Sequence, residues 1–554
     1  MARSNAAGAL VSLARIARHY APGLGVRKLP LLRLLSRANL PTARQVRLLH
    51  ELLCFLDAYP DNRRVRKLVR RMLNGFRNRP DLLRHRASLT GTGIAGTDTP
   101  YRFFWPTARW IAQNWPGALV LDREDPDHAQ TILEALPQLF EPIQAEYLRN
   151  QAAPTLEILD RLRPQAITDA DYLIGLVAAM PGDDFTREAF FDRVDPPLVL
   201  RAARATPERT TARFDRLAIH YRSTPLRLPR PDLRREAKHP PRRILPLRGR
   251  DAEAAIRLAR ISMITRERDL AAFQFANPQD AFLVDDGQGL GFAMVGTLPE
   301  RRALLPAIYG GLTLQNGLPM GYVQIDILGR HAELSFNTFE TFRNGEAARV
   351  FARLVAAVHH VFHCDSFSIE PYQLGAGNEE GIESGAWWFY HRFGFRPRAA
   401  AARRIAAREI RRIARDRGHR SSRRTLRVLA RTHLYYSLVP ARRASLPRIR
   451  ALHDAGTREL RRFGQADAVE RKAAAVTAAW RRLAASKSYR PGKDTRRMLG
   501  QWAGIVLTLT ARGRWSAGER RQLLRLIEAK ADTDERRYLR RLLRLRRLRR
   551  YLDC

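Results

Sequence analysis

Cysteine is almost absent from this chain, whose 554 residues include only Cys54, Cys364 and Cys554. The three are far apart and have no paired spacing, which argues against a disulfide framework and a cysteine zinc site. This usage suits a reducing compartment, so we expect a cytoplasmic protein. Long apolar runs are also missing, because none reaches about 18 residues, the length of a transmembrane helix. The apolar stretch 6–14 ends at Arg15, so we expect no secretory signal.

Acidic residues are scarce as well: 55 Asp and Glu stand against 98 Lys and Arg, for a formal net charge of +43. None precedes Glu51, and residues 399–450 contain only Glu409 and Asp416, so the positive charge is segregated to the two ends. Such ends attract nucleic acid or an anionic surface. Nearly all the cations are arginine, however, and arginine with alanine enrichment is also what GC-rich codon usage produces. Composition alone does not separate the two interpretations.

Several familiar site motifs are missing. There is no G-x-S-x-G nucleophile elbow and no P-loop. The segment 91–96 satisfies G-x-G-x-x-G, but Thr97-Asp98-Thr99-Pro100 follows it where a dinucleotide fingerprint would open a helix, so we predict a loop. His359 and His363 would share a helical face. They lack a nearby carboxylate partner, so we interpret them as a helix C-terminus and expect no metal.

The length predicts more than one domain, since single cores rarely exceed about 250 to 300 residues. We predict three regions: a mainly helical domain at 1–239, a central α+β domain at 240–398, and an arginine-rich helical region at 399–554. Pro41 and Pro60 should interrupt the helices of the first region. The proline- and arginine-rich stretch 224–243 is typical of a linker. The expected fold class is therefore α+β, with a mixed central sheet flanked by helical regions.

The central region alternates predicted strands and helices. A helix is expected at 252–264, and apolar residues from 350 to 362 recur at helical spacing. Asn316-Gly317 lies between apolar runs and predicts a hairpin, because both residues tolerate positive φ. The predicted strands are 244–247, 281–284, 289–295, 309–315, 320–328, 332–339 and 366–370.

The segment 378–397, NEEGIESGAWWFYHRFGFRP, is the most informative part of the chain. Ala386, Tyr390 and Gly394 are four residues apart, so on a helix they share one face. Taken alone, this pattern also fits a helix whose aromatic residues pack in a core. Together with the preceding order of hairpin, strand, glycine turn, helix and strand, it resembles the fourth helix of GNAT-superfamily acyltransferases. Tyr390 stands where that family carries a tyrosine beside the thioester sulfur.

The resemblance spans roughly residues 243–398 and includes departures from the family pattern. The turn 342–348 corresponds to the loop that holds the CoA pyrophosphate, yet it is one residue short between Arg343 and Gly345. Glu346 adds a negative charge there, and a glutamate in a first helical turn also stabilises the helix. Glu383 stands where many members have asparagine. After Phe395 the chain enters a helical sequence instead of two further strands.

The resemblance implies a direct transfer of an acyl group from acetyl-CoA or a longer acyl-CoA to a small-molecule or protein amine. Tyr390 would protonate the departing thiolate, and a carboxylate would relay the proton of the amine. Glu340 and Glu370 follow predicted strand ends, while Glu333 and Glu383 stay open as base candidates, and Asn337 would orient the acceptor. The implied cofactor-binding residues are Ser335, Phe336, Arg343, Asn344, Gly345, Ala347, Ala348 and Asn378.

Two other functions remain open. The short pyrophosphate loop and the missing strands favour a GNAT-derived binding module without catalysis, and the arginine-rich ends favour an RNA- or DNA-associated protein. In the last segment, Tyr538, Leu542, Leu545 and Leu552 recur at helical spacing among arginines. We predict that this stripe docks on the protein. The alternative is that the segment lies on RNA phosphates or on an anionic membrane.

Overall fold

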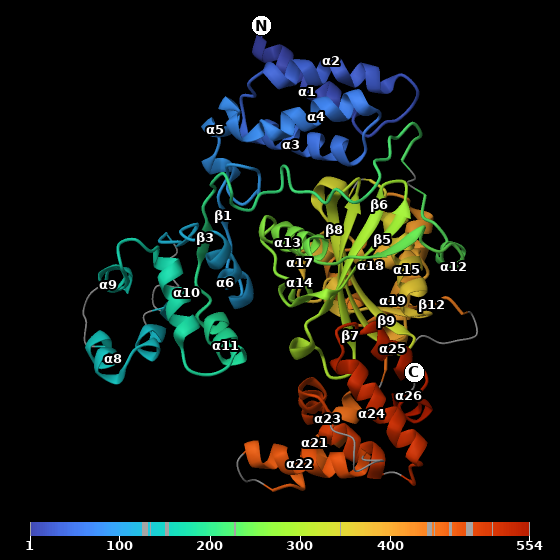
Figure 1. The fold of residues 1–554 in the computed structure, drawn as a ribbon. Coiled ribbons are helices and arrows are strands. Elements are labelled where there is room, and N and C mark those ends of the chain that lie inside the picture. The colour runs from blue at the N-terminus through green and yellow to red at the C-terminus, as the bar shows by residue number, and fades with distance from the viewer. Residues whose placement is uncertain are drawn as a thin grey trace. The chain divides into compact units, whose positions relative to one another are not determined.

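The computed structural model describes residues 2–124, 131–132, 134–149, 155–226, 229–343, 345–439, 446–447, 449–464, 468–483, 491–511 and 513–552. They form two compact units (Figure 1). Unit 1 comprises Met1–Leu226, Ala254–Phe275 and Gln315–Pro319, and unit 2 comprises Arg227–Glu253, Ala276–Leu314 and Met320–Cys554. The predicted α+β class is confirmed, because a mixed sheet of nine strands is accompanied by N- and C-terminal helical regions.

Unit 1 begins with a group of helices joined by short turns. Thr42 and Asn62 start the third and fourth helices, each by accepting a hydrogen bond from a main-chain amide of the first turn. The predicted interruptions at Pro41 and Pro60 are confirmed, since both prolines lie between helices. The elements are α1 (Ala2–Ile16), α2 (Leu24–Arg37), α3 (Ala43–Ala58), α4 (Arg63–Asn74), η1 (Phe76–Asn78), α5 (Pro80–Arg84) and η2 (Ala87–Leu89).

The remainder of unit 1 combines helices with a small sheet of order β1-β3-β2, whose neighbours are antiparallel. The segment 91–96 is a loop, as predicted, with positive φ at Gly91, Gly93 and Gly96. The elements are β1 (Thr99–Pro100), α6 (Trp105–Asn114), β2 (Leu119–Leu121), η3 (Leu136–Leu139), α8 (Pro142–Arg149), α9 (Thr155–Leu162), α10 (Asp169–Ala179), α11 (Asp184–Val194), β3 (Leu198–Leu200) and α14 (Ala271–Gln274).

The sheet of unit 2 has the order β11-β12-β10-β9-β8-β7-β6-β5-β4. Its registered pairs are antiparallel except for β9 and β10, which run parallel. Asn316 and Gly317 both have positive φ between β7 and β8, which confirms the predicted hairpin. The strands are β4 (Arg243–Pro246), β5 (Ala276–Gly287), β6 (Leu290–Thr297), β7 (Ala307–Gln315), β8 (Leu318–Leu328), β9 (His331–Thr338), β10 (Ser366–Ile369), β11 (Arg396–Pro397) and β12 (Leu434–Ser437).

The helices around this sheet follow the predicted order. Helix α15 (Ala347–Phe362) lies against the apolar face of β9, where the Phe351 and Phe336 rings are 5.4 Å apart. The predicted linker holds a helix, α12, whose residues Glu236 and Ala237 accept hydrogen bonds from α15. Other helical elements of unit 2 are α12 (Leu233–Ala237), η4 (Pro299–Arg301), η5 (Glu340–Phe342), α16 (Pro371–Leu374), α17 (Glu379–Glu383) and α18 (Ala386–Arg392). The helix predicted at 252–264 is α13 (Arg250–Ile264), most of which belongs to unit 1.

The sheet is completed by residues that the sequence predicted to be helical. After β11 the chain forms α19 (Ala400–Arg415) and α20 (Arg423–Leu429), and then β12, which inserts between β10 and β11. The prediction of continuous helix after Arg398 is therefore wrong at 434–437. Those residues pair with two strands far away in the sequence, and only that pairing makes them a strand.

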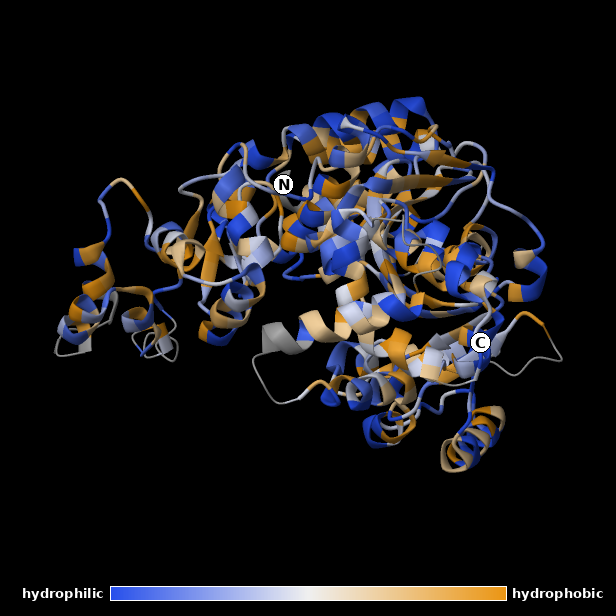
Figure 2. Ribbon diagram, turned by 60° about the horizontal axis from the view of Figure 1, so that its bottom comes forward, coloured by the Kyte–Doolittle hydropathy of each residue, from blue (hydrophilic) through white to orange (hydrophobic). Residues whose placement is uncertain are grey.

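The last helical region docks through its apolar residues, as predicted. Tyr538 is buried and donates to the Leu305 carbonyl oxygen at 2.7 Å, and Leu542 and Leu552 are fully buried. The helices carry both hydrophobic and hydrophilic residues along their length (Figure 2). Among the described residues, no helix is long and apolar enough to cross a membrane. The helices are α21 (Ile449–Arg461), α22 (Ala468–Leu483), α23 (Lys493–Ala511), α24 (Ala517–Ala531), α25 (Arg536–Leu542) and α26 (Arg546–Leu552).

Candidate functional site

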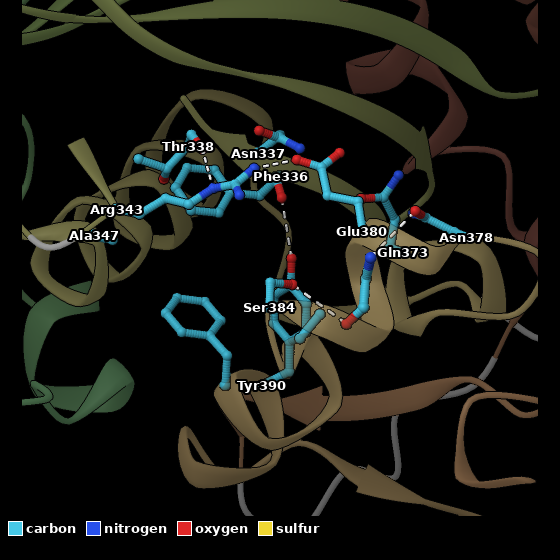
Figure 3. Close-up of a pocket in the computed structure, with 13 residues that line it drawn as sticks. Phe336, Asn337, Thr338, Arg343, Ala347, Gln373, Asn378, Glu380, Ser384 and Tyr390 are labelled. Carbon is cyan, nitrogen blue, oxygen red and sulfur yellow. Dashed lines mark hydrogen bonds and ion pairs between the residues drawn. The ribbon is translucent and has the colours of Figure 1, made fainter. Parts of the chain in front are cut away.

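A cleft lies where strands β9 and β10 part. Their register ends at the pair Ser368 and Glu333, while β9 continues to Thr338. Beyond that pair, the end of β9, the start of α15 and the segment from α16 to α18 enclose a cavity of about 200 Å³ (Figure 3). Its lining residues are Phe336, Asn337, Thr338, Arg343, Ala347, Gln373, Asn378, Glu380, Gly381, Ser384, Ala386, Phe389 and Tyr390.

Tyr390 reaches the cleft from α18. Its hydroxyl donates to the Phe336 carbonyl oxygen at 3.3 Å, and its ring packs edge-on against Phe351. Ala386 lines the cleft one turn earlier on the same helix, whereas Gly394 lies beyond the end of the helix with φ 99°. Burial raises the pKa of Tyr390, so the phenol stays protonated at neutral pH. A protonated hydroxyl can donate to negative charge that develops beside it.

Arg343 lies at the mouth of the cleft and is held by two groups. Its Nε donates to the Thr338 carbonyl oxygen at 3.1 Å, and its guanidinium forms an ion pair with Glu380 of α17 (Figure 3). Both side chains are partly exposed, so solvent screens the pair. Glu346 has a different partner, because its buried carboxylate lies 3.6 Å from Arg349. The acidic residue beside the cleft is thus Glu380, which the sequence did not single out.

The predicted cofactor-binding residues fall into three groups. Phe336, Arg343, Ala347 and Asn378 line the cleft. Ser335, Gly345 and Ala348 do not, and the Ser335 hydroxyl instead donates to Glu370 at 3.1 Å. Asn344 lies outside the described residues.

The start of α15 lies at the cleft. Glu346 is the N-cap residue and its side chain makes no capping hydrogen bond, while Ala347, the first helical residue, lines the cleft. The first amides of a helix have no acceptor inside the helix, and they attract anions. This helix end therefore offers a suitable position for a phosphate group.

The predicted catalytic residues are only partly brought together. Asn337 lines the cleft with Tyr390, and its buried Oδ1 atom accepts no hydrogen bond from the described residues. Glu370 does not line the cleft, and Glu340 is exposed in η5. Glu383, the other base candidate at this end, is 64% exposed and pairs with Arg423. The base proposed from strand ends is therefore not positioned in the cavity itself.

The opposite face of β9 carries a polar network that includes the fourth base candidate. Glu333 accepts from the Ser368 hydroxyl at 2.8 Å and lies 3.2 Å from His433. Burial alone would raise the pKa of Glu333, but these two partners outweigh it and lower the pKa. Across the ladder, Asp326 has a pKa raised to about 6, by burial first and then by the charges of Glu333 and Glu370.

Several lining residues were missed because they lie on the turns between β10 and α18. Gln373 and Gly381 belong to short helices that no apolar period predicts, and Ser384 lies in the turn after α17. Asn378 is the exception, and its side chain also accepts from the Gly381 amide as the cap of α17. The only sequence signal for these lining residues was a polar run between a predicted strand and a helix rich in aromatic residues.

No metal-binding group of histidine, cysteine, aspartate and glutamate occurs in the described part of the chain. His359 Nδ1 lies 2.7 Å from the Cys364 carbonyl oxygen, and His363 follows the last residue of α15 with φ 59°. These two histidines mark a helix C-terminus, as the sequence predicted.

Comparisons of this chain with protein-family models, with curated proteins and with solved structures find no match. The geometry of the cleft is therefore the basis for a functional proposal.

Proposed function

We propose that this chain is an acyltransferase that transfers an acyl group from acetyl-CoA or a longer acyl-CoA to an amine. The observation that carries the proposal is the position of Tyr390. Its hydroxyl lies at the Phe336 carbonyl, where β9 and β10 part beside the cavity. A protonated hydroxyl at the end of a cleft between two strands suits a thioester substrate. The sulfur of the thioester needs a hydrogen-bond donor when it leaves as a thiolate.

The lining suits an elongated donor with an anionic end. The pantetheine arm is a chain of amides, and it would pair with the main chain of β9 beyond Glu333, as an added strand does. The pyrophosphate would meet the amides at the start of α15, near Ala347. Phe336 and Phe389 supply apolar walls. Each part of the donor thus has a complementary group in the cleft.

In the reaction, the neutral amine attacks the thioester carbonyl carbon, the carbon–sulfur bond breaks, and the proton lost by nitrogen balances the one gained by sulfur. Tyr390 donates to the sulfur as the thiolate forms. Asn337, with its unsatisfied Oδ1, would accept a hydrogen bond from the incoming amine. Because Glu380 is the only carboxylate among the described residues that line the cavity, we propose that ordered water relays the proton of the amine towards Glu370 or Glu333.

Isothermal calorimetry of the full chain with acetyl-CoA, octanoyl-CoA and palmitoyl-CoA tests the donor. We expect saturable heat and a raised melting temperature with at least one of them. Acetyl-pantetheine, which lacks the pyrophosphate, is the matched ligand and should bind more weakly. If none of the acyl-CoAs produces heat or a thermal shift, the acyltransferase proposal is wrong.

A binding module without catalysis is the second candidate, and one observation favours it. Glu380 neutralises Arg343 at the mouth of the cleft, although a free cation there would serve phosphate better. Thiol release from bound acyl-CoA, measured over a panel of primary amines, decides between the two. Binding without thiol release for any amine would favour the module.

A further inference from the structure

The acidic residues of the N-terminal helices are all directed inward. Residues 2–86 contain only four, Glu51, Asp57, Asp61 and Asp81, whose side chains are 21%, 5%, 6% and 0% exposed. Each is paired with a cation inside unit 1; these partners are Arg209, Arg66, Lys28 and Arg79 respectively. The surface of this part of the chain therefore carries no exposed carboxylate to balance its cations.

Many basic side chains of the same helices point outward. Arg33 and Arg37 on α2 and Arg63, Arg64, Lys67 and Arg71 on α4 are exposed, and none forms an ion pair with a described residue. Helices α2 and α4 pack against each other (Figure 1). Their exposed cations thus add to one positive field, since surface charges act on each other over about 10 Å at 0.1 M salt.

The apolar side of α4 is already occupied. Val65, Val69, Met72 and Leu73 are buried in the core of the helical group. A helix that lies in a membrane interface needs a free apolar face to insert, and α4 offers only its charged face. Exposed apolar side chains on these helices, such as Val26, occur singly. The surface therefore suits a soluble polyanion better than a lipid bilayer.

Aromatic side chains are also withdrawn from this surface. Residues 2–86 contain no tryptophan, and Tyr20, Phe55, Tyr59 and Phe76 are at most 2% exposed. Proteins that bind single-stranded nucleic acid stack its bases on exposed aromatic rings. Because no tyrosine, phenylalanine or tryptophan ring is exposed here, the surface can contact phosphates but offers no such ring on which unpaired bases could stack.

We propose that the exposed faces of α2 and α4 bind the phosphate backbone of double-helical nucleic acid without reading its sequence. Arg63, Lys67 and Arg71 recur at every fourth residue, which places them about 6 Å apart along the helix axis. A duplex carries one charge for about every 1.7 Å of its axis, so each of these cations has a phosphate within reach and can release condensed counterions. This surface is independent of the acyl-CoA cleft and of the reaction proposed there.

Fluorescence anisotropy of a labelled 20-base-pair duplex, titrated with the full chain at 50 to 200 mM salt, tests the surface. The variant combines Arg63→Gln, Arg64→Gln, Lys67→Gln and Arg71→Gln. We expect at least about tenfold weaker binding at 100 mM salt, and a salt slope reduced by about 0.9 for each phosphate that is no longer neutralised. Circular dichroism should be unchanged, because these exposed residues carry no packing.

The matched control removes the same charge elsewhere. It combines Arg403→Gln, Arg404→Gln, Arg408→Gln and Arg411→Gln on the exposed face of α19. We expect it to keep the affinity of the wild-type chain within about twofold. Equal loss in both variants would mean that net charge alone governs binding, and the proposal would be overturned.

Two further ligands identify the class of partner. A single strand of the same length should bind more weakly than the duplex, and a duplex of unrelated sequence should bind equally well. Tighter binding to the single strand would overturn the proposal. The proposal would also be overturned if the α4 variant lost binding to phosphatidylserine vesicles but kept the duplex affinity of the wild-type chain. The surface would then bind a membrane.

Discussion

The Tyr390 hydroxyl is bonded to the main-chain carbonyl of Phe336 at 3.3 Å, and this contact joins α18 to the end of β9. The Phe336 carbonyl lies beyond the last registered pair of β9 and β10, so the tyrosine occupies part of the place that a continuing strand would fill. This hydrogen bond fixes the orientation of the phenol beside the cavity. Tyr390 therefore joins two elements of the fold and also takes part in the proposed reaction.

Replacing that phenol separates the two roles. In Tyr390→Phe we expect turnover to fall by about 10²-fold or more, because donation to the leaving thiolate is lost. Stability should fall by only about 1 kcal/mol, the net worth of one hydrogen bond. Acyl-CoA affinity should stay within about twofold, since the lost interaction exists only in the transition state. Thiol release, urea unfolding and calorimetry measure the three quantities.

Tyr309→Phe is the matched control, because Tyr309 is also buried in unit 2 and donates to a buried acceptor, Asp280, at 2.8 Å. It should lower stability without a comparable loss of turnover in the folded protein. An equal loss of turnover in both variants would return Tyr390 to a packing role.

The ion pair at the mouth of the cleft should weaken donor binding. In Glu380→Gln, Arg343 is released and a negative charge is removed near the proposed phosphate position. The pair is partly exposed and worth less than about 1 kcal/mol, so we expect up to about fivefold tighter acyl-CoA binding by calorimetry. Glu383→Gln, which neutralises a more exposed carboxylate of the same helix, should change affinity less. Weaker binding in Glu380→Gln would show that Arg343 does not serve the phosphates.

The buried carboxyl of Asp280 should make stability depend on pH. Burial, and then the charge of Asp534, raise its pKa to about 6 in the folded state. The folded protein therefore binds this proton more tightly than the unfolded chain, and the stability gained is fully present below about pH 4 and lost as the pH rises through about 6.

The test is urea unfolding of the wild-type chain and Asp280→Asn at pH 4.5 and pH 8. The wild-type chain should lose about 2 kcal/mol relative to the variant over this interval. The comparison removes the other titrating groups, which both proteins share. A difference that does not change with pH would mean that Asp280 is already ionised in the folded protein throughout.

The terminal helices should stabilise the unit through their apolar side. Leu542→Ala removes a fully buried side chain of α25, and we expect a loss of about 2 to 5 kcal/mol. Arg540→Ala, on the exposed side of the same helix, should change stability by less than about 0.5 kcal/mol. Deletion of 536–554 should lower the melting temperature and the solubility. Equal stability of the two point variants would contradict the docked arrangement.

Local patterns in the sequence were sufficient for the elements around the cleft. The β-rich run 332–339 predicted β9, the spacing of Ala386 and Tyr390 predicted the helix that carries them, and Asn316-Gly317 predicted the hairpin between β7 and β8. These signals depend only on residues close together in the sequence and on the backbone preferences of those residues. They can therefore be interpreted without any knowledge of the rest of the fold.

The tertiary structure alone decided which distant residues meet. It inserts β12 between β10 and β11, pairs Arg343 with Glu380, and directs the carboxylates of the N-terminal helices towards internal cations. A four-residue strand is stabilised by its partners and not by its own propensity, and an ion pair depends on which faces of two elements come together. Composition determined that the chain is strongly basic. Only folding determined that the N-terminal surface keeps positive charge without an exposed negative charge beside it, because each acid there is paired with a cation inside the unit.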